Sequence, residues 1–178
     1  IPLNDTQHNK LNVIEPKGYL QYKSQNLIPV VVQDFALLAT EFPIVFVKNA
    51  ETGSFVAVVM MGLKQGLNLY CQQADWEPLV TPLNFTNAPF SLARKNSDTD
   101  ELVVCIDESS NLLSNSEGSA LFSPSGEQSQ YLKNRCDSLL KVAEYSRQTQ
   151  AIVDYFAEKK LFKSRQLTVN LNDEKNPV

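Results

Sequence analysis

The clearest structural signal in the chain lies in residues 43–63, PIVFVKNAETGSFVAVVMMGL. Two runs of β-branched and aromatic residues are separated by the turn-forming residues NAETG. This pattern is typical of a β-hairpin. Both runs are almost continuously apolar, which predicts that at least one strand is covered on both faces and lies in the centre of a sheet.

On the N-terminal side of the hairpin, residues 33–43 (QDFALLATEFP) predict a helix. Asp34 is the expected N-cap, and Pro43 is expected to end the helix because the residue before a proline avoids helical dihedral angles. One face of this helix is apolar and repeats at helical spacing; it consists of Phe35, Leu38, Ala39 and Phe42.

On the C-terminal side, KQGLNLYCQ (64–72) predicts a short strand, and residues 73–90 predict a long proline-containing loop. FSLARK (90–95) and ELVVCIDE (101–108) then predict two strands joined by the polar turn NSDTD (96–100). Long loops inside a small domain are often functional.

The last third of the chain predicts two helices and one final strand, QLTVNLN (166–172). The order of elements favours an α+β fold for a single domain over residues 1–178: an antiparallel sheet of about five strands, flanked by an early helix and two C-terminal helices. The apolar face of the first of these two helices is Leu132, Cys136, Leu139, Leu140 and Ala143, and that of the second is Ile152, Tyr155 and Phe156.

Composition excludes several classes of function. The formal net charge is −4 and charged residues make up 20% of the chain, so nucleic acid and anionic membranes are not expected partners. The most basic run, EKKLFKSR (158–165), is better explained as a solvated helix end than as an anion site. No segment has the length of apolar sequence needed to span a bilayer. No secretory signal is visible in a chain that begins at Ile1.

The polar stretch CIDESSNLLSNSEG (105–118) invites comparison with a calcium-binding loop. A loop counted from Asp107 would need glycine at its sixth position and glutamate at its twelfth, but Leu112 and Gly118 stand there. We therefore expect a polar turn that leaves a strand.

The chain has three widely spaced cysteines and one histidine, His8. The cysteine spacing does not suit a zinc site and is typical of buried thiols in a reducing compartment. A catalytic group of Cys105, His8 and Asp107 remains an alternative, although Cys105 lies in an apolar strand where an inert thiol is favoured. No metal or cofactor is predicted.

Trp76 and Arg94 are candidate ligand contacts, because a flat aromatic face and a guanidinium group could together bind a carboxylate or a peptide. The simpler interpretation is favoured: Trp76 packs against its own loop and Arg94 forms a surface ion pair.

Seven pieces of sequence together carry a resemblance to a known family. They are IPLNDTQHNKLNV (1–13), IPVVVQDFALLATEFPIVFVK (28–48), VAVVMMGLKQGLNLY (56–70), Trp76, APFSLAR (88–94), CIDESSNLLSNSEGSALFSPSGE (105–127) and SRQTQAIVDYFAEKKLF (146–162). In the same order and over nearly the whole chain, they resemble the SapC-like family. The resemblance implies accessory proteins encoded near TonB-dependent outer-membrane receptors, halogenase-like flavoproteins and cupin-like oxygenases. It also implies a Gram-negative source, a cytoplasmic location and a chain that continues past residue 178, so that a truncated C-terminus is expected.

The resemblance brings no catalytic residues, and LVTPLNFTNAPF (79–90) departs from the family's Tyr-Val-Pro and paired arginines. We therefore expect a non-enzymatic binding protein that recognises a protein partner, a peptide or a small metabolite linked to surface or outer-membrane transport. The alternatives are an enzyme acting on a peptide or glycan, and a subunit of a homo-oligomer. The expected ligand contacts are Trp76, Phe85, Phe90 and Arg94.

Overall fold

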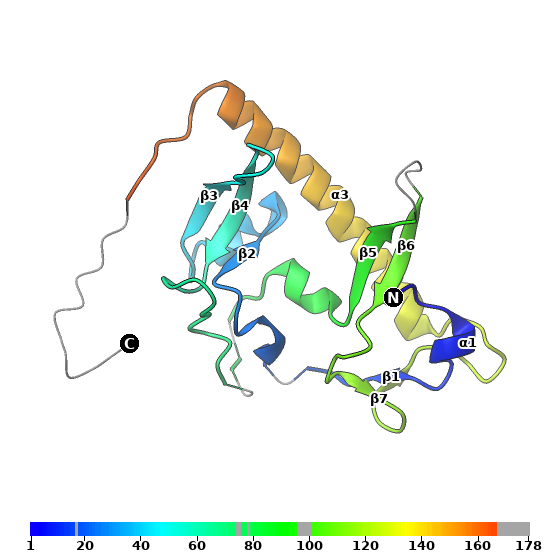
Figure 1. Ribbon diagram of the computed structural model, residues 1–178. Coiled ribbons are helices and arrows are strands. Elements are labelled where there is room, and N and C mark those ends of the chain that lie inside the picture. Colours follow the sequence, from blue (N-terminus) through cyan, green and yellow to red (C-terminus); the bar gives the residue numbers. More distant parts are fainter. Residues whose placement is uncertain (17, 74–75, 78, 96–100, 167–178) are drawn as a thin grey trace, which may run out of the picture.

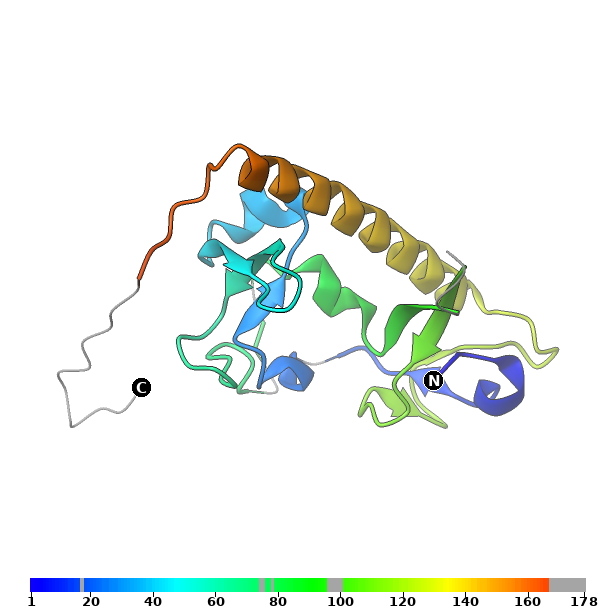
Figure 2. The same ribbon diagram turned by 45° about the horizontal axis from the view of Figure 1, so that its top comes forward.

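One long helix connects two halves of the molecule, each built around small antiparallel sheets (Figures 1 and 2). This computed structural model describes residues 1–16, 18–73, 76–77, 79–95 and 101–166. The helix, α3 (Gln130–Glu158), has 29 residues and is therefore about 43 Å long at the rise of an α-helix. The two halves have separate hydrophobic clusters of buried residues.

The first half contains the hairpin expected from residues 43–63, and that prediction is confirmed. Its two strands are β3 and β4, and the strand order β2-β4-β3 makes β4 the central strand, as the apolar pattern predicted. The elements of this half are η1 (Leu20–Tyr22), β2 (Leu27–Pro29), η2 (Val32–Asp34), α2 (Phe35–Leu38), β3 (Ile44–Lys48), β4 (Phe55–Met60) and η3 (Leu83–Asn87).

The helix expected over residues 33–43 is shorter than predicted. Asp34 occupies the N-cap position of α2, as expected, but it has helical dihedral angles and its side chain makes no capping hydrogen bond. Its carboxylate instead accepts a hydrogen bond from the backbone N–H of Leu83 at 3.1 Å, across to the start of η3. Two members of the predicted apolar face, Leu38 and Phe42, are buried, whereas Ala39 is exposed.

The strand expected over residues 64–72 does not form. Asn68 is completely buried there, and its side-chain oxygen accepts hydrogen bonds from the backbone N–H groups of Tyr70 and Cys71. Its side-chain nitrogen donates to the carbonyl of Gln25. A side-chain amide that satisfies neighbouring backbone groups in this way replaces the sheet ladder with a turn.

The second half holds the other expected hairpin and a smaller sheet of order β7-β1-β8. β5 and β6 pair antiparallel as predicted, while the expected turn at 96–100 lies outside the described residues, as does the expected last strand from residue 167 onward. The elements of this half are α1 (Asp5–His8), β1 (Asn12–Val13), β5 (Phe90–Arg94), β6 (Leu102–Ile106), β7 (Leu113–Ser114) and β8 (Ser119–Ala120).

The two predicted C-terminal helices are one continuous helix, so that prediction is wrong. No glycine or proline interrupts residues 130–158, and the polar residues near the middle have helical roles. Thr149 donates its hydroxyl hydrogen to the carbonyl of Tyr145 at 2.7 Å. Leu132 and Leu139 pack in the second half's cluster and Val153 packs in the first, so α3 joins the two cores.

The α+β class is confirmed, with antiparallel sheets of two or three strands and a long C-terminal helix. The expected single sheet of about five strands is wrong, because the β5–β6 hairpin does not pair with β3–β4. None of the described helices, α3 included, combines the length and apolar composition required of a bilayer span.

Replacing Thr149 by valine should lower the free energy of unfolding by about 1–3 kcal/mol. The buried Thr149 hydroxyl accepts a hydrogen bond from the backbone N–H of Val32 at 2.8 Å. Valine keeps the shape but leaves that N–H without an acceptor. Urea unfolding followed by circular dichroism measures the change, and Thr149→Ser, which keeps the hydroxyl, is the matched control. Equal stability of the two variants would show that this hydrogen bond does not hold α3 against η2.

Candidate functional site

Trp76 and Phe85 lie in the first half, packed against one cluster of aromatic rings. Phe85 is 1% exposed and stacks on Tyr22 with ring centroids 3.9 Å apart. Trp76 is half-buried and contacts Tyr19 edge-to-face at 6.0 Å. Burial raises the pKa of Tyr22 to about 12, which indicates that the rings of this cluster lie in apolar surroundings.

Phe90 and Arg94 lie at the two ends of β5, in the second half. Phe90 is buried in that half's core, and Arg94 is exposed. The structure thus divides the four expected ligand contacts between the two halves of the molecule. Their role in binding stays a prediction.

The residues of the alternative catalytic group also make separate contacts. Asp107 accepts hydrogen bonds from the backbone N–H and the hydroxyl of Ser109, and these bonds hold the pKa of its carboxyl below the usual value. Cys105 lies within β6. The ring of His8 contacts Asn4 and Glu108. Within the described part of the chain, no hydrogen bond or ion pair joins Cys105, His8 and Asp107.

Residues 105–118 therefore form a strand, a turn and a second short strand, as expected for a polar turn. The described residues contain no group of three or more His, Cys, Asp or Glu side chains that could hold a metal ion.

The three thiols are free. Burial raises the pKa of Cys71 to about 11 and, together with the charge of Asp137, raises the pKa of Cys136. A thiol with a raised pKa remains protonated at neutral pH and is a poor nucleophile. Neither Cys71 nor Cys136 therefore suits covalent chemistry.

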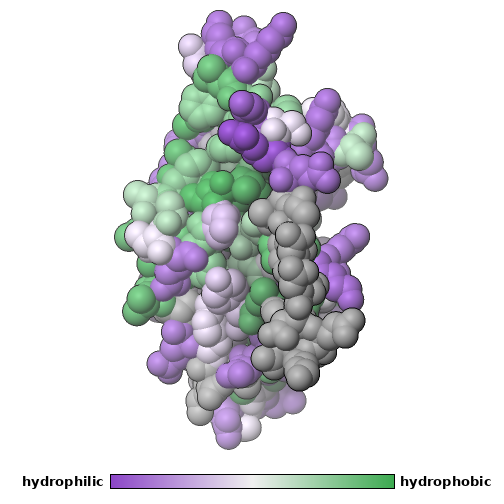
Figure 3. All heavy atoms as spheres, turned by 90° about the vertical axis from the view of Figure 1, so that its left-hand side faces the viewer, coloured by the Kyte–Doolittle hydropathy of each residue, from purple (hydrophilic) through white to green (hydrophobic). Residues whose placement is uncertain are grey.

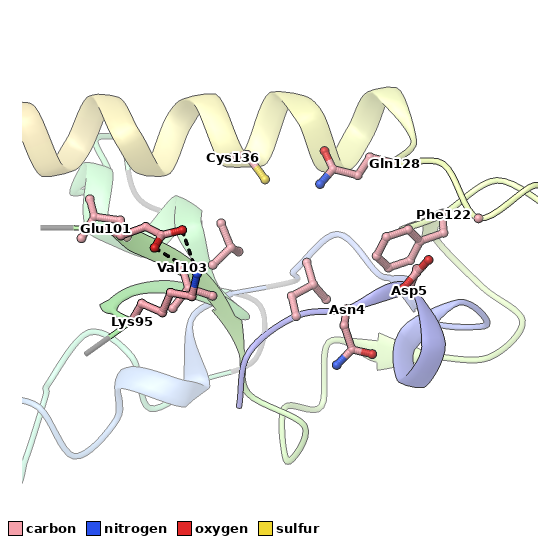
Figure 4. A pocket seen from close by; sticks show the side chains of 12 residues that line it. Asn4, Asp5, Lys95, Glu101, Val103, Phe122, Gln128 and Cys136 are labelled. Atoms are coloured by element: carbon pink, nitrogen blue, oxygen red, sulfur yellow. Dashed lines mark hydrogen bonds and ion pairs between the residues drawn. The ribbon is translucent and has the colours of Figure 1, made fainter. Parts of the chain in front are cut away.

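A pocket of about 490 Å³ lies between the N-terminal segment, the start of β6 and the start of α3 (Figure 4). Cys136 points into it from α3, and Asn4 and Asp5 line it from the opposite side. Lys95 and Glu101 pair at 2.9 Å on its rim, so their charges compensate each other. The pocket offers mixed polar and apolar walls without a clear chemical preference.

Another hollow, of about 840 Å³, lies between the hairpin β3–β4 and the segment that follows α3. We call it the basic groove. One wall is residues 45–48 of β3, and the other is residues 161–165. Phe162 supports the second wall, because its ring stacks on Phe46 at 4.6 Å and packs against Phe55 at 4.7 Å.

The basic groove has an apolar floor and cationic rims. Its charged lining residues are Lys48, Lys163 and Arg165, and none of the carboxylates among the described residues lines it. Hydrophobic atoms gather on this side of the molecule next to strongly hydrophilic ones (Figure 3). Three cations around an apolar surface are notable in a chain whose formal net charge is −4, and they attract acidic groups.

β3 is also the edge strand of its sheet. The backbone N–H of Asn49 donates to the carbonyl of Ser54, and the backbone N–H of Met60 donates to the carbonyl of Pro43. Asn49 and Pro43, which flank β3, are therefore in hydrogen-bonded pairs with the opposite strand. Hydrogen-bonded and non-hydrogen-bonded residue pairs alternate along an antiparallel ladder. The backbone N–H and C=O groups of Phe46 therefore point away from β4, toward the open edge of the sheet. No described residue forms a backbone hydrogen bond with that outer edge at Phe46 or Lys48.

Sequence reasoning missed the basic groove. Residues 158–165 were interpreted as a solvated helix end, but α3 ends at Glu158 and the residues after it build a wall. The available signal was Phe162, a large apolar residue among lysines. Its partners on the β3–β4 hairpin are far away in the sequence.

Comparison with known proteins gives one match. The family model described as SapC matches residues 3–178. No curated protein and no solved structure matches the chain.

Proposed function

Because this chain belongs to the SapC family, whose model covers residues 3–178, we propose that it is an accessory binding protein that takes up a peptide segment of a protein partner. The family resemblance supports the further proposals of a Gram-negative source, a cytoplasmic location and a link to surface or outer-membrane transport. The observation that carries the binding role is the basic groove beside an edge strand.

The shape of the groove favours an extended occupant. Both walls are continuous runs of chain, residues 45–48 and 161–165. The outward N–H and C=O groups of β3 would pair with a peptide strand laid beside them, which is a common mode of peptide recognition. Val47, which lines the groove and is 37% exposed, offers an apolar contact to alternate side chains of that strand.

The charges of the groove favour an acidic occupant. Lys48, Lys163 and Arg165 line it, and no carboxylate in the described part of the chain lines it with them. Acidic side chains that alternate with apolar ones would meet the cations and the Phe46–Phe162 surface together. We therefore propose an acidic, apolar-alternating segment as the ligand.

A charge reversal tests this proposal. The probe is the fluorescein-labelled peptide acetyl-EVEFEVE-amide, and fluorescence anisotropy measures its binding to the full chain. Lys163→Glu combined with Arg165→Glu should weaken binding about tenfold or more, because close charge pairs across an interface contribute strongly. Lys141→Glu, on an exposed position of α3, is the matched control and should leave binding unchanged. Added salt should also weaken binding.

Several outcomes would contradict the proposal. Equal binding of acetyl-KVKFKVK-amide would show that charge does not select the ligand. Equal effects of the groove variant and the control would place binding elsewhere. Light scattering decides whether a second copy of the chain is the occupant, since the groove variant would then dissociate an oligomer.

A further inference from the structure

The sole histidine of the chain lies at the floor of a second pocket, on the other half of the molecule. This pocket of about 350 Å³ lies between α1 and β7, which are close together in Figures 1 and 2. His8 is 1% exposed. Glu108, which also lines the pocket, lies beside His8, and its side chain is 54% exposed. The remaining lining residues are Gln7, Leu11, Ser110, Leu113, Ser114 and Asn115.

One nitrogen of the His8 ring has no hydrogen-bond partner. Nδ1 lies 3.1 Å from the backbone N of Asn4 and 2.9 Å from its carbonyl oxygen. Nε2 is buried and makes no hydrogen bond. Its 3.4 Å separation from the nearer carboxylate oxygen of Glu108 is an ion-pair distance, longer than a well-formed N–H···O bond.

A buried ring nitrogen without a partner is uncommon and calls for an explanation, because buried polar groups are nearly always hydrogen-bonded. A ligand atom in the pocket that lies within hydrogen-bond distance of both Nε2 and the Glu108 carboxylate, to the side of the line that joins them, would satisfy the nitrogen. Both groups line the same pocket, and the volume of that pocket falls in the range of small-molecule sites.

The lining chemistry selects the ligand. Among the residues that the structure describes, no lysine or arginine lines the pocket, which disfavours phosphate or carboxylate ligands. The polar side chains other than His8 and Glu108 are amides and hydroxyls, namely Gln7, Ser110, Ser114 and Asn115. Such groups both donate and accept hydrogen bonds, as a ligand hydroxyl does.

The contact with Asn4 leads to the same ligand class. Because Nδ1 lies beside both a donor and an acceptor of Asn4, either tautomer of His8 is supported, and Nε2 can either donate or accept. A hydroxyl complements Nε2 in both states. It can also donate to the Glu108 carboxylate.

The frame of the pocket is held in place before any ligand arrives. β1 pairs with β7 through Asn12↔Ser114 and Val13↔Leu113. Asn4 caps α1 by accepting a hydrogen bond from the backbone N–H of Gln7 at 2.9 Å. A fixed frame lowers the entropy that a small ligand must overcome on binding.

We propose that this pocket binds a neutral, hydroxyl-bearing ligand, a sugar or a polyol, with one hydroxyl shared by His8 Nε2 and the Glu108 carboxylate. The proposal is independent of the basic groove, because the two sites share no residue. A negative result at one site therefore does not contradict the proposal for the other.

Nuclear magnetic resonance of the ¹⁵N-labelled full chain tests the site, since a single histidine gives a single imidazole to observe. The probes are methyl glucoside and sorbitol, and inorganic phosphate is the charged comparison. At least one hydroxylated probe should shift the Nε2 signal along a saturating curve, and phosphate should not.

Glu108→Gln should weaken that binding about tenfold, because a neutral amide replaces a charged acceptor. Glu108 is exposed enough for the variant to fold. Glu117→Gln, on an exposed residue outside the pocket lining, is the matched control and should bind as the unmodified chain does. Three results would overturn the proposal: an imidazole signal unmoved by both hydroxylated probes, a response to phosphate instead, or equal affinities of the two variants.

Discussion

Replacing Arg147 by proline should lower the free energy of unfolding by about 3 kcal/mol or more. Arg147 lies inside α3, between the residues that pack in the two cores. A proline there removes one hydrogen bond of the helix, and its ring clashes with the carbonyl of the preceding turn. Because α3 joins both halves, the kink would also disturb the packing of Leu139 or Val153.

Arg147→Ala is the matched control for this prediction. The Arg147 side chain is exposed and pairs with Glu144 at 2.8 Å within the helix. Alanine removes this ion pair, which is worth only a few tenths of a kcal/mol on a helix surface, and leaves the backbone intact. Denaturant unfolding followed by circular dichroism compares the two variants. Similar stability of both would support two helices with a break near residue 147.

Truncating Phe85 to alanine should cost about 3–5 kcal/mol of folding free energy. The Phe85 ring is 1% exposed, stacks on Tyr22 and lies 5.0 Å from the ring of Tyr19. Alanine would leave a cavity among these rings as well as remove the buried apolar surface. Thermal and urea unfolding measure the loss.

Phe85→Leu is the matched control, because it keeps most of the apolar volume and should cost less than alanine. The comparison also bears on the expectation that Phe85 is a ligand contact. A loss of stability below about 1 kcal/mol for Phe85→Ala would contradict its place in the core and favour a surface role.

The sequence alone predicted the strands that pair with a strand next to them in the chain. The β3–β4 and β5–β6 hairpins follow from alternating runs of β-branched residues with turn residues between them. The central position of β4 follows from its continuous apolar run. Helical periodicity also located the residues of α3, although not its continuity, since its apolar positions predict two separate helical faces.

The sequence was insufficient where a side chain has a partner far along the chain. Asp34 resembled an N-cap, but its carboxylate bonds to Leu83. His8 was considered with Cys105 and Asp107, but its ring lies beside Glu108. Asp107 and Glu108 follow the end of β6 and enter a turn, and only the folded chain shows that Glu108 lies beside the His8 ring.

Local pattern thus established the α+β class, the two hairpins and the apolar character of the cores, because propensity and periodicity act between residues close in sequence. The folded chain alone determined the basic groove and the His8 pocket. The groove forms where residues 161–165 meet residues 45–48, and the pocket forms where α1 meets the turn after β6. These contacts join segments that are far apart in the sequence, and they depend on how α3 and the sheets pack. The spacing of residues within one segment does not predict them.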